Sequence, residues 1–258
     1  MLGRYISQLL YEDRCRMAEI NSRLLATCKL HEQTFLPYKN YCGGVKDIVM
    51  CGAGPSLNDF QPIEDAVYIA VNRAFLFEKV KFDFIFAQDY EGINMVLEQL
   101  LNYRGNECVK FLGTQNVKNK IIPESLIIQC NAKKFDTDWY IYGNGCKGEM
   151  TLDLESRPLC NMMNVGQSVM QLCLYMNPRR IYIVGCDMSG NHFSPGNQSD
   201  EEVKKQGILM EKTFESRRKD LIRRWIEIKD FAAVHYPNTE IISINPVGLK
   251  GIFNDIYQ

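Results

Sequence analysis

The stretch that most constrains the fold of this chain is residues 48–57, whose sequence is I-V-M-C-G-A-G-P-S-L. Four apolar residues run directly into a turn that contains Gly52 and Gly54. A buried strand that ends in a glycine turn is how an open α/β sheet presents its backbone to a ligand. Glycine adopts positive φ at no steric cost and lets a phosphate approach closely. We therefore expect a phosphate-binding turn, with Pro55 placed to open a short helix after it.

Short apolar runs alternate with helical segments along the rest of the chain. Amphipathic or apolar helices are expected over 4–30, 164–176 and 201–234. The alternation predicts a mostly parallel, Rossmann-like sheet of about seven strands, with helices on both faces. The expected strands are 46–51, 66–71, 82–87, 108–112, 125–130, 180–186 and 240–244.

The domain organisation follows from the same pattern. An N-terminal helical segment, 1–44, precedes a nucleotide-binding α/β domain, 45–258. An irregular insert at about 131–160 interrupts that domain. A loop of this length is often functional, for example a lid, and the equal alternative is unrecognised strands or a mobile insert. The N-terminal helix is expected either to pack separately or to form an oligomer contact.

Charge and cysteine content restrict the class of protein and its partners. The net charge is −1, so no basic field attracts nucleic acid, and we expect none as a partner. Ten cysteines without a C-x-x-C pair favour a reduced, cytoplasmic protein. The first residues become charged too early for a signal peptide, and no apolar run approaches the length of a membrane span. Peripheral association with the inner membrane face and a homo-oligomer are both compatible with the sequence.

Most expected strands end in a polar or glycine-rich stretch. Because the carboxyl ends of parallel strands meet at one edge of a sheet, these residues are expected to surround one ligand site. The first turn is neither G-x-G-x-x-G nor a Walker loop, which argues against an ordinary NAD fold and against a P-loop ATPase. The candidate binding residues at this edge are Gly52, Ala53, Gly54, Pro55, Ser56, Asn72, Gln88, Asp89, Gly185, Cys186 and Asp187.

Three of these side chains have alternative roles. Asn72 carries a donor and an acceptor that could bind a base or a ribose, and it could instead cap the following helix. Asp89 and Asp187 could hold a divalent metal beside phosphates. The alternative for Asp187 is a hydrogen bond that shapes its own loop.

The chain has only three histidines. His31 and His235 are expected at the surface or in packing contacts. His192 follows the 180–186 strand and is the candidate general base, because an imidazole titrates near neutral pH. A loop histidine can equally be merely solvated. The sequence contains no G-x-S-x-G elbow and no Cys/His spacing typical of zinc.

Four blocks together resemble a known family. They are the G-A-G-P-S-L turn, I-A-V-N-R-A-F-L-F over 69–77, the segment 164–188, and the closing I-S-I-N-P-V-G-L-K-G. They resemble bacterial surface-glycan sialyltransferases that use CMP-sialic acid. They resemble equally the related MptE-like and flagellin-modification Maf proteins.

The resemblance to the sialyltransferases implies an inverting, GT-A-like glycosyltransferase without a D-x-D metal motif. Such an enzyme needs no metal or other cofactor and acts in surface glycan or lipopolysaccharide biosynthesis. Its donor is a nucleotide-activated, CMP-linked, sialic-acid-like sugar, and its acceptor is a glycan or lipid-linked glycan. In this family the glycine turn and Ser56 face the nucleotide phosphate and ribose, and Asn72 faces the nucleotide. The segment Asn164, Val165 and Gly166 faces the donor, and a histidine, here His192, deprotonates the acceptor hydroxyl.

The chain departs from the sialyltransferase pattern at three points. Those enzymes have Thr-Ser at the positions of Asn164 and Val165, and their catalytic histidine lies further beyond the strand than His192 does. The tyrosines that steady the leaving phosphate in those enzymes have no clear equivalents here, and Tyr140 and Tyr142 are the candidates for their role.

Two other functions stay open. The segment F-D-F-I-F-A-Q-D resembles the MptE-like branch, which implies a pyrophosphokinase that transfers pyrophosphate from ATP to a pterin-type acceptor. That enzyme would require Mg²⁺, with Asp89 and Asp187 as the candidate ligands. The third possibility is a nucleotide-binding or assembly module without turnover.

Overall fold

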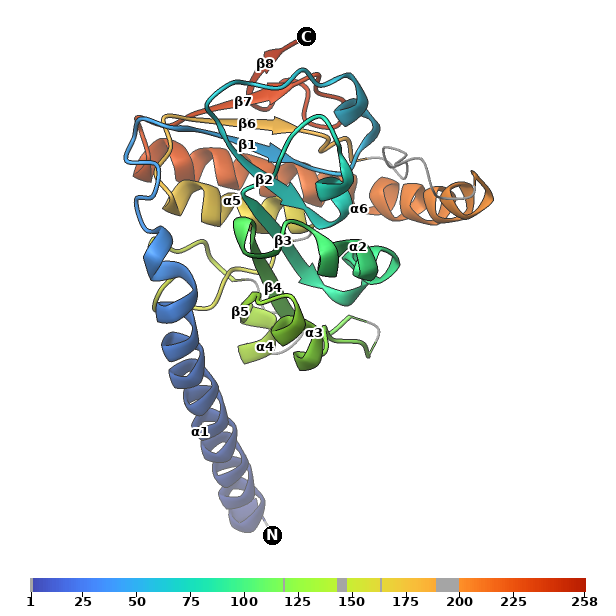
Figure 1. Cartoon of the computed structure of the whole chain (residues 1–258). Helices are drawn as coiled ribbons and strands as arrows, with labels where there is room; N and C mark the ends of the chain where they lie inside the picture. Colours follow the sequence, from blue (N-terminus) through green and yellow to red (C-terminus); the bar gives the residue numbers. More distant parts are fainter. Residues whose placement is uncertain (1, 118, 143–147, 163, 189–199) are drawn as a thin grey trace.

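The computed structural model of the chain describes residues 2–117, 119–142, 148–162, 164–188 and 200–258. Its centre is one sheet of eight strands in the order β5-β4-β3-β2-β1-β6-β7-β8, and every neighbouring pair is parallel (Figure 1). The strands are β1 (Asp47–Cys51), β2 (Val67–Val71), β3 (Phe84–Asp89), β4 (Val109–Gln115), β5 (Lys133–Phe135), β6 (Arg180–Val184), β7 (Glu240–Ile244) and β8 (Asn254–Ile256).

Strand β1 is central because its residues are apolar on both faces. Ile48 and Met50 belong to the hydrophobic cluster on one face of the sheet, and Val49 and Cys51 belong to the cluster on the other. Successive strand residues point to opposite faces, so a strand covered on both sides needs a continuous apolar run. Ile48 pairs with a residue of β2 on one side and of β6 on the other.

The strand order contains a topological switch point between β1 and β6. From β1 the chain moves outward through β2, β3, β4 and β5, and then returns to the other side of β1 to build β6, β7 and β8. Connections therefore leave the carboxyl ends of β1 and β6 in opposite directions. In doubly wound sheets the crevice at this point is where ligands bind.

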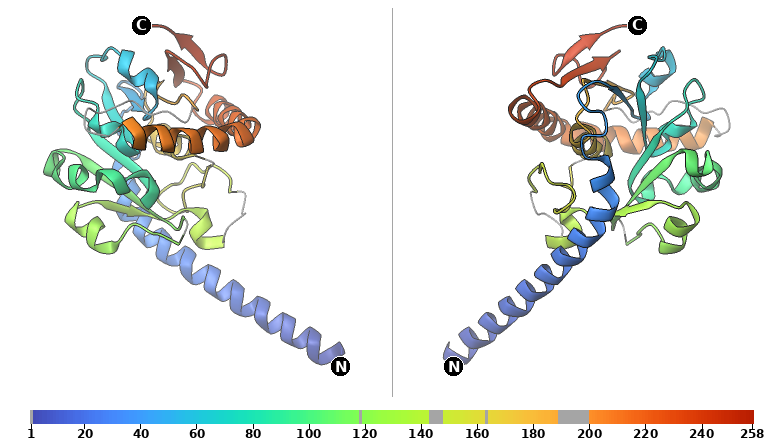
Figure 2. Two further views of the ribbon diagram at one scale, coloured as in Figure 1. Left: turned by 90° about the vertical axis from the view of Figure 1, so that its right-hand side faces the viewer. Right: turned by 60° about the vertical axis from the view of Figure 1, so that its left-hand side comes forward.

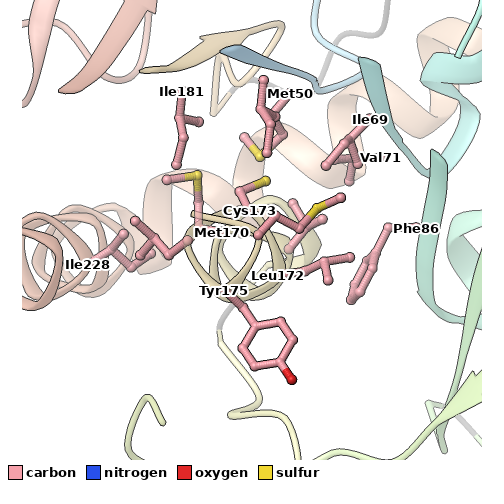
Figure 3. Packing of buried hydrophobic residues seen from close by; sticks show 14 of the residues in the cluster. Met50, Ile69, Val71, Phe86, Met170, Leu172, Cys173, Tyr175, Ile181 and Ile228 are labelled. Atoms are coloured by element: carbon pink, nitrogen blue, oxygen red, sulfur yellow. The ribbon is translucent and has the colours of Figure 1, made fainter. Parts of the chain in front are cut away.

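The two faces carry different helices. Long helices α5 (Val165–Tyr175) and α6 (Asp200–His235) cover one face with the last turns of α1 (Leu2–Phe35) (Figure 1). In Figure 3 side chains from α5, from sheet strands and from Ile228 of α6 converge in this cluster. The other face carries α2 (Leu97–Asn102), α3 (Glu124–Gln129) and the short 3-10 helices η2 (Pro55–Asp59) and η3 (Asn72–Leu76). The remaining helices are η1 (Leu36–Tyr38), η4 (Tyr90–Gly92), η5 (Asn94–Val96), η6 (Gly105–Glu107) and α4 (Asp138–Tyr142).

Helix α1 joins the body only through its last turns. Thr27, His31, Thr34 and Phe35 are buried, whereas residues 5–19 are all exposed. Figure 2 shows the helix projecting away from the sheet in both views. Of the helices in the described ranges, none is both long enough and apolar enough to cross a membrane.

The predicted parallel α/β sheet with helices on both faces and an N-terminal helix is confirmed. One predicted strand is wrong, because residues 125–130 lie mostly in α3. Leu126 and Ile127 are buried while Ile128 is exposed, and Pro123 and Glu124 supply the start of a helix. The apolar run L-I-I is too short to distinguish a buried strand from a helix by periodicity.

The fifth and eighth strands were not predicted. Strand β5 lies inside the expected irregular insert 131–160, which also contains α4. Strand β8 is polar, N-D-I, and follows the last expected strand. Both are three-residue edge strands, too short to show an alternating pattern, and short edges limit pairing with other chains.

Candidate functional site

The turns after β1 and β6 are bonded to each other across the switch point. The amide of Gly52 donates to the carbonyl oxygen of Val184 at 2.8 Å, and the amide of Gly54 donates to that of Gly185 at 2.7 Å. The first predicted turn is thus part of a two-turn unit. Its other half is the predicted segment Gly185, Cys186 and Asp187.

Glycine is required in this unit because the two backbones approach closely. A Cβ atom on Gly52 would lie 2.4 Å from the Gly185 oxygen, and one on Gly54 would lie 2.6 Å from Asp187 Oδ2. Neither glycine has positive φ; in this unit that conformation is found at Gly185, with φ +70°. The freedom of glycine to adopt positive φ is therefore not used at Gly52 and Gly54, and steric contact with the second turn explains why these positions are glycine.

Asp187 locks Ser56 into this unit. The Ser56 amide donates to Asp187 Oδ2 at 2.8 Å, its hydroxyl donates to Oδ1, and the amide of Gly185 donates to the Ser56 hydroxyl at 3.2 Å. Burial raises the pKa of the Asp187 carboxyl, and the two bonds from Ser56 oppose that shift. Asp187 thus shapes the neighbouring turn. The alternative role, a hydrogen bond that shapes its own loop, concerns residues that lie mostly outside the described ranges.

Asn72 follows β2 at the same edge of the sheet and is conformationally unusual. Its φ is +52°, a region that asparagine tolerates better than most residues. Val71, and not Asn72, holds the N-cap position of η3, and Asn72 Oδ1 accepts no hydrogen bond from the described residues, so the alternative role as a helix cap is wrong. The Oδ1 atom is buried and has no hydrogen-bond partner in the described part of the chain. Gly92 lies against this amide, where a Cβ would come within 2.5 Å of Oδ1.

A buried amide cluster occupies the carboxyl ends of β3 and β4. The Gln88 side-chain nitrogen donates to Gln115 Oε1 and lies against the Asn161 side-chain amide, whose oxygen is best placed to accept from Trp139 Nε1 at 2.9 Å. The Gln88 oxygen is buried and unpartnered within the described ranges. The backbone amide of Asn161 donates to Asp138 Oδ1 at 2.8 Å.

Asp138 is the second buried carboxylate near this edge, and it is 3% exposed. Burial raises its pKa, and bonds from the backbone amides of Asn161 and Trp139 oppose the shift. Its Oδ2 atom is buried without a partner among the described residues and lies beside Gly148.

Sequence reasoning missed Gln115, Asp138 and Asn161. Gln115 ends a strand, as the predicted residues do, but β4 runs to Gln115 and the expected strand stopped at 112. Asp138 and Asn161 belong to the insert and the residues after it, where the sequence has no regular pattern. Only the tertiary fold brings them to Gln88.

Helix α5 begins beside the second turn. Asn164 is its N-cap, and Oδ1 of Asn164 accepts from the amide of Gln167 at 2.9 Å. At Gly166 a Cβ would lie 3.4 Å from Cys186 Sγ, so the helix N-terminus and the turn after β6 are in contact. Burial and the nearby Asp187 raise the pKa of the Cys186 thiol to about 12. The predicted residues Asn164, Val165 and Gly166 therefore lie at the switch point.

The remaining predicted residues are placed as follows. Asp89 caps η4, since its Oδ1 accepts from the amide of Gly92 at 3.0 Å. Within the described ranges no group of three or more His, Cys, Asp or Glu side chains is arranged to hold a metal ion. Tyr140 lies beside α1, with the Arg23 guanidinium 5.7 Å from its ring centroid. Tyr142 is exposed at the end of α4.

The histidines divide into three cases. His192, the predicted base, lies outside the described residues. His31 is fully buried and bonds to three backbone groups. His235 ends α6, with its ring centroid 4.6 Å from that of Phe231. The prediction that the last two are surface or packing residues agrees with these positions.

Two solved structures of the sialyltransferase CstII are similar to this chain. The structure from Campylobacter jejuni in complex with the substrate analogue CMP-3FNeuAc is 12% identical, with a TM-score of 0.45, over 82% of this chain and 86% of that chain. The structure in complex with a trisaccharide acceptor and CMP is 13% identical, with a TM-score of 0.43, over 77% and 80%. No protein-family model and no curated protein sequence matches this chain. The function is therefore argued from the chain's own residues.

Proposed function

We propose that the protein is a glycosyltransferase that binds a nucleotide-activated sugar, CMP-linked and sialic-acid-like, at the β1–β6 switch point. The observation that carries the proposal is Asn72. Positive φ costs asparagine less than most non-glycine residues, whereas a buried unpaired acceptor costs about 1–3 kcal/mol. Strain of this kind persists where the surrounding structure imposes it, and it clusters at ligand sites.

An amide oxygen without a partner selects ligands that offer an N–H or O–H donor. The exocyclic amine of cytosine and the hydroxyls of ribose are such donors. Asn72 lies at the end of β2, which is the strand next to β1. A nucleotide whose phosphate occupies the crevice could therefore place its base or ribose against this residue.

The phosphate would lie between the first turn and the N-terminus of α5. Free amides in the first turn of a helix and the helix dipole favour an anion. The same groups would stabilise the phosphate that departs with the nucleotide when the sugar is transferred. Ser56 would act by holding the turn, since its hydroxyl already bonds to Asp187 and Gly185.

The acceptor would be a glycan or lipid-linked glycan hydroxyl, deprotonated by His192 as general base. This assignment rests on the position of His192 after β6 in the sequence. The rate enhancement would come from the positioning of the two substrates, from phosphate stabilisation and from that base. No metal is required in this scheme.

A nucleotide screen by thermal shift tests the proposal, because a ligand that binds the native state raises the unfolding temperature. CMP, UDP, GDP and ATP are each added with and without Mg²⁺. We expect CMP to raise the midpoint in the absence of metal. A shift that requires both ATP and Mg²⁺ would contradict the proposal and favour the pyrophosphokinase. A CMP shift without turnover of any CMP-sugar would favour a binding module.

The His192→Ala variant tests the base. We expect transfer from a CMP-sugar to fall by roughly 100-fold or more, the usual contribution of a general base, while the thermal shift with CMP is retained. His235→Ala is the matched control and should transfer sugar at the wild-type rate. Wild-type turnover in the His192 variant would remove this residue from the mechanism.

A further inference from the structure

The projecting part of α1 carries an apolar seam that is interrupted once, at Asp13. Ile6, Leu10, Met17, Ile20 and Leu24 follow one another at alternating spacings of three and four residues when Asp13 is included. The same spacing continues into Thr27, His31 and Thr34, which are buried against the body. This is the seam of a coiled coil, with an average period of 3.5 residues. The α/β body covers the end of the seam that contains Thr27, His31 and Thr34, and the other end projects away from the body (Figure 2).

The seam outside the buried turns is long enough for helix pairing. From Ile6 to Leu24 it measures about 27 Å at 1.5 Å per residue, and only its last members, Ile20 and Leu24, are partly buried. Side chains at its centre are largely exposed, with Leu10 at 54% and Met17 at 55%. An isolated helix of this length is marginal in water, so its stability depends on covering the apolar side.

The charges along α1 argue against a lipid surface as the cover. Between residues 4 and 23 there are four arginines and three acidic residues, so the segment is close to neutral. Helices that lie on anionic membranes are rich in Lys and Arg, and an acidic residue in the apolar stripe opposes insertion. Asp13 occupies the middle of this stripe.

The negative charge of Asp13 is complementary to positive charges on a second copy of the helix. Arg14 and Arg16 flank Asp13 on the two sides of the seam. In a parallel pair the two Asp13 carboxylates would share one layer and repel each other. In an antiparallel pair centred on Cys15, Asp13 lies opposite Met17 of the second copy and within reach of its two arginines.

We propose that the free half of α1 pairs antiparallel with α1 of a second copy of this chain, holding two α/β bodies at opposite ends of a two-helix coil. In this register Leu10 lies opposite Ile20 of the second copy. The pair closes under two-fold symmetry, so each copy uses the same residues.

Light scattering of the full chain, measured over a range of concentrations, tests the pairing. We expect the mass of two chains for the wild type and of one chain for Leu10→Glu/Met17→Glu. Tyr11→Glu/Leu25→Glu is the matched control, since these residues are 69% and 66% exposed but lie off the seam. The control should keep the mass of two chains. A wild type that is monomeric at every concentration, or a control that dissociates as the seam variant does, would overturn the proposal.

Two further measurements complete the test. Cosedimentation uses vesicles of phosphatidylcholine and phosphatidylglycerol; pelleting of a monomeric wild type would assign the seam to lipid and overturn the proposal.

The orientation is tested in a Cys15→Ser background. Leu10→Cys chains should form a disulfide with Ile20→Cys chains and not with one another. Efficient cross-linking of Leu10→Cys chains alone would show a parallel pair. The thermal midpoint of the body should be unchanged in Leu10→Glu/Met17→Glu, because both side chains are exposed on the projecting part of the helix.

Discussion

At the scale of single residues, Asn72 has two unusual features that can be tested independently, its backbone conformation and its side-chain amide. The backbone conformation could be supplied by glycine, and the amide could then be absent without steric cost. The position nevertheless carries an amide whose oxygen is buried and unpartnered, and this observation points to a ligand. This distinction can be tested by one substitution.

Asn72→Gly keeps the conformation and removes the amide. We expect the free energy of unfolding to stay within about 0.5 kcal/mol of the wild type or to rise, since an unpaired buried oxygen disappears. CMP affinity should fall by roughly 10-fold to 100-fold, the loss of one hydrogen bond to a buried group. Titration calorimetry with CMP measures the change.

Asn177→Gly provides the matched control for this substitution. Asn177 also has positive φ, +51°, but its side chain donates to Asn40 Oδ1 at 2.7 Å, before β6 at the amino edge of the sheet. Its replacement should leave CMP affinity unchanged. Equal CMP affinity in both variants and in the wild type would exclude Asn72 from the nucleotide site.

Asp138 leads to a prediction on pH and stability. Burial raises its folded-state pKa above the unfolded value of about 3.9. The carboxyl therefore favours folding below the unfolded pKa, and that contribution is lost as the pH rises through the folded pKa. Asp138→Asn keeps an acceptor for the Asn161 amide, so we expect it to be more stable than the wild type at neutral pH, with the difference shrinking toward about pH 4.

Urea denaturation at a series of pH values measures this difference. Asp220→Asn is the control, because Asp220 is half-exposed on α6 and pairs with Arg223. It should show no such gain. A loss of stability in Asp138→Asn at neutral pH would mean that the ionised carboxylate is held by favourable contacts.

At the scale of elements, His31 joins α1 to the insert and to β5. Its Nδ1 lies 3.1 Å from the carbonyl oxygen of Leu154 and 2.7 Å from that of Arg157. Its Nε2 accepts from the amide of Asp136 at 2.9 Å. The bonds fix a neutral ring with the proton on Nδ1, because Nε2 must accept.

We expect acid to weaken this junction. Burial lowers the folded-state pKa of His31 below its ordinary value of about 6.5. The unfolded chain therefore binds a proton first, and stability is lost as the pH falls below about 6.5 toward the folded pKa. His31→Ala should cost about 2–4 kcal/mol, from the cavity and the unpaired backbone groups, and should remove this part of the pH dependence.

The measurement is the unfolding free energy of both proteins at several pH values between about 5 and 8. His235→Ala, at the exposed end of α6, should change stability by less than about 0.5 kcal/mol. A His31→Ala protein that keeps the wild-type pH slope would place the responsible group elsewhere.

At the scale of the whole molecule, α1 consists of an attached part and a projecting part. Residues 5–19 contribute no buried side chain to the body, while Thr27, His31, Thr34 and Phe35 do. A chain that starts at residue 21 should therefore keep the thermal midpoint of the monomeric body within about 2 °C. A chain that starts at residue 36 loses the buried residues and should unfold at a markedly lower temperature.

Calorimetric scans of the two truncated chains at low concentration check this prediction. The comparison separates the contribution of α1 to the body from its contribution to association. If both truncations lowered the midpoint equally, the projecting turns would have to contact the body.

Much of the architecture could be predicted because it depends on local patterns. Strands β1, β2, β3 and β6 each contain an uninterrupted apolar run of four or five residues, and each run is followed by a polar or glycine residue. Short elements could not be predicted in this way. Strands β5 and β8 have three residues each, and α3 has an apolar run that suits a strand equally well.

The candidate site divides along the same line. By itself the sequence determined which residues end the central strands, because hydrophobic periodicity and turn chemistry are local properties. It therefore also determined that one edge of a parallel sheet carries Gly52–Ser56, Asn72, Gln88 and Asp187. Only the tertiary structure decided what those residues do there. It showed that the glycines are required by contact with the turn after β6, that Ser56 is bonded to Asp187, and that Asn72 has an unpartnered oxygen. It also brought Asp138 and Asn161 to Gln88. These facts depend on contacts between residues far apart in the chain, which no local pattern encodes.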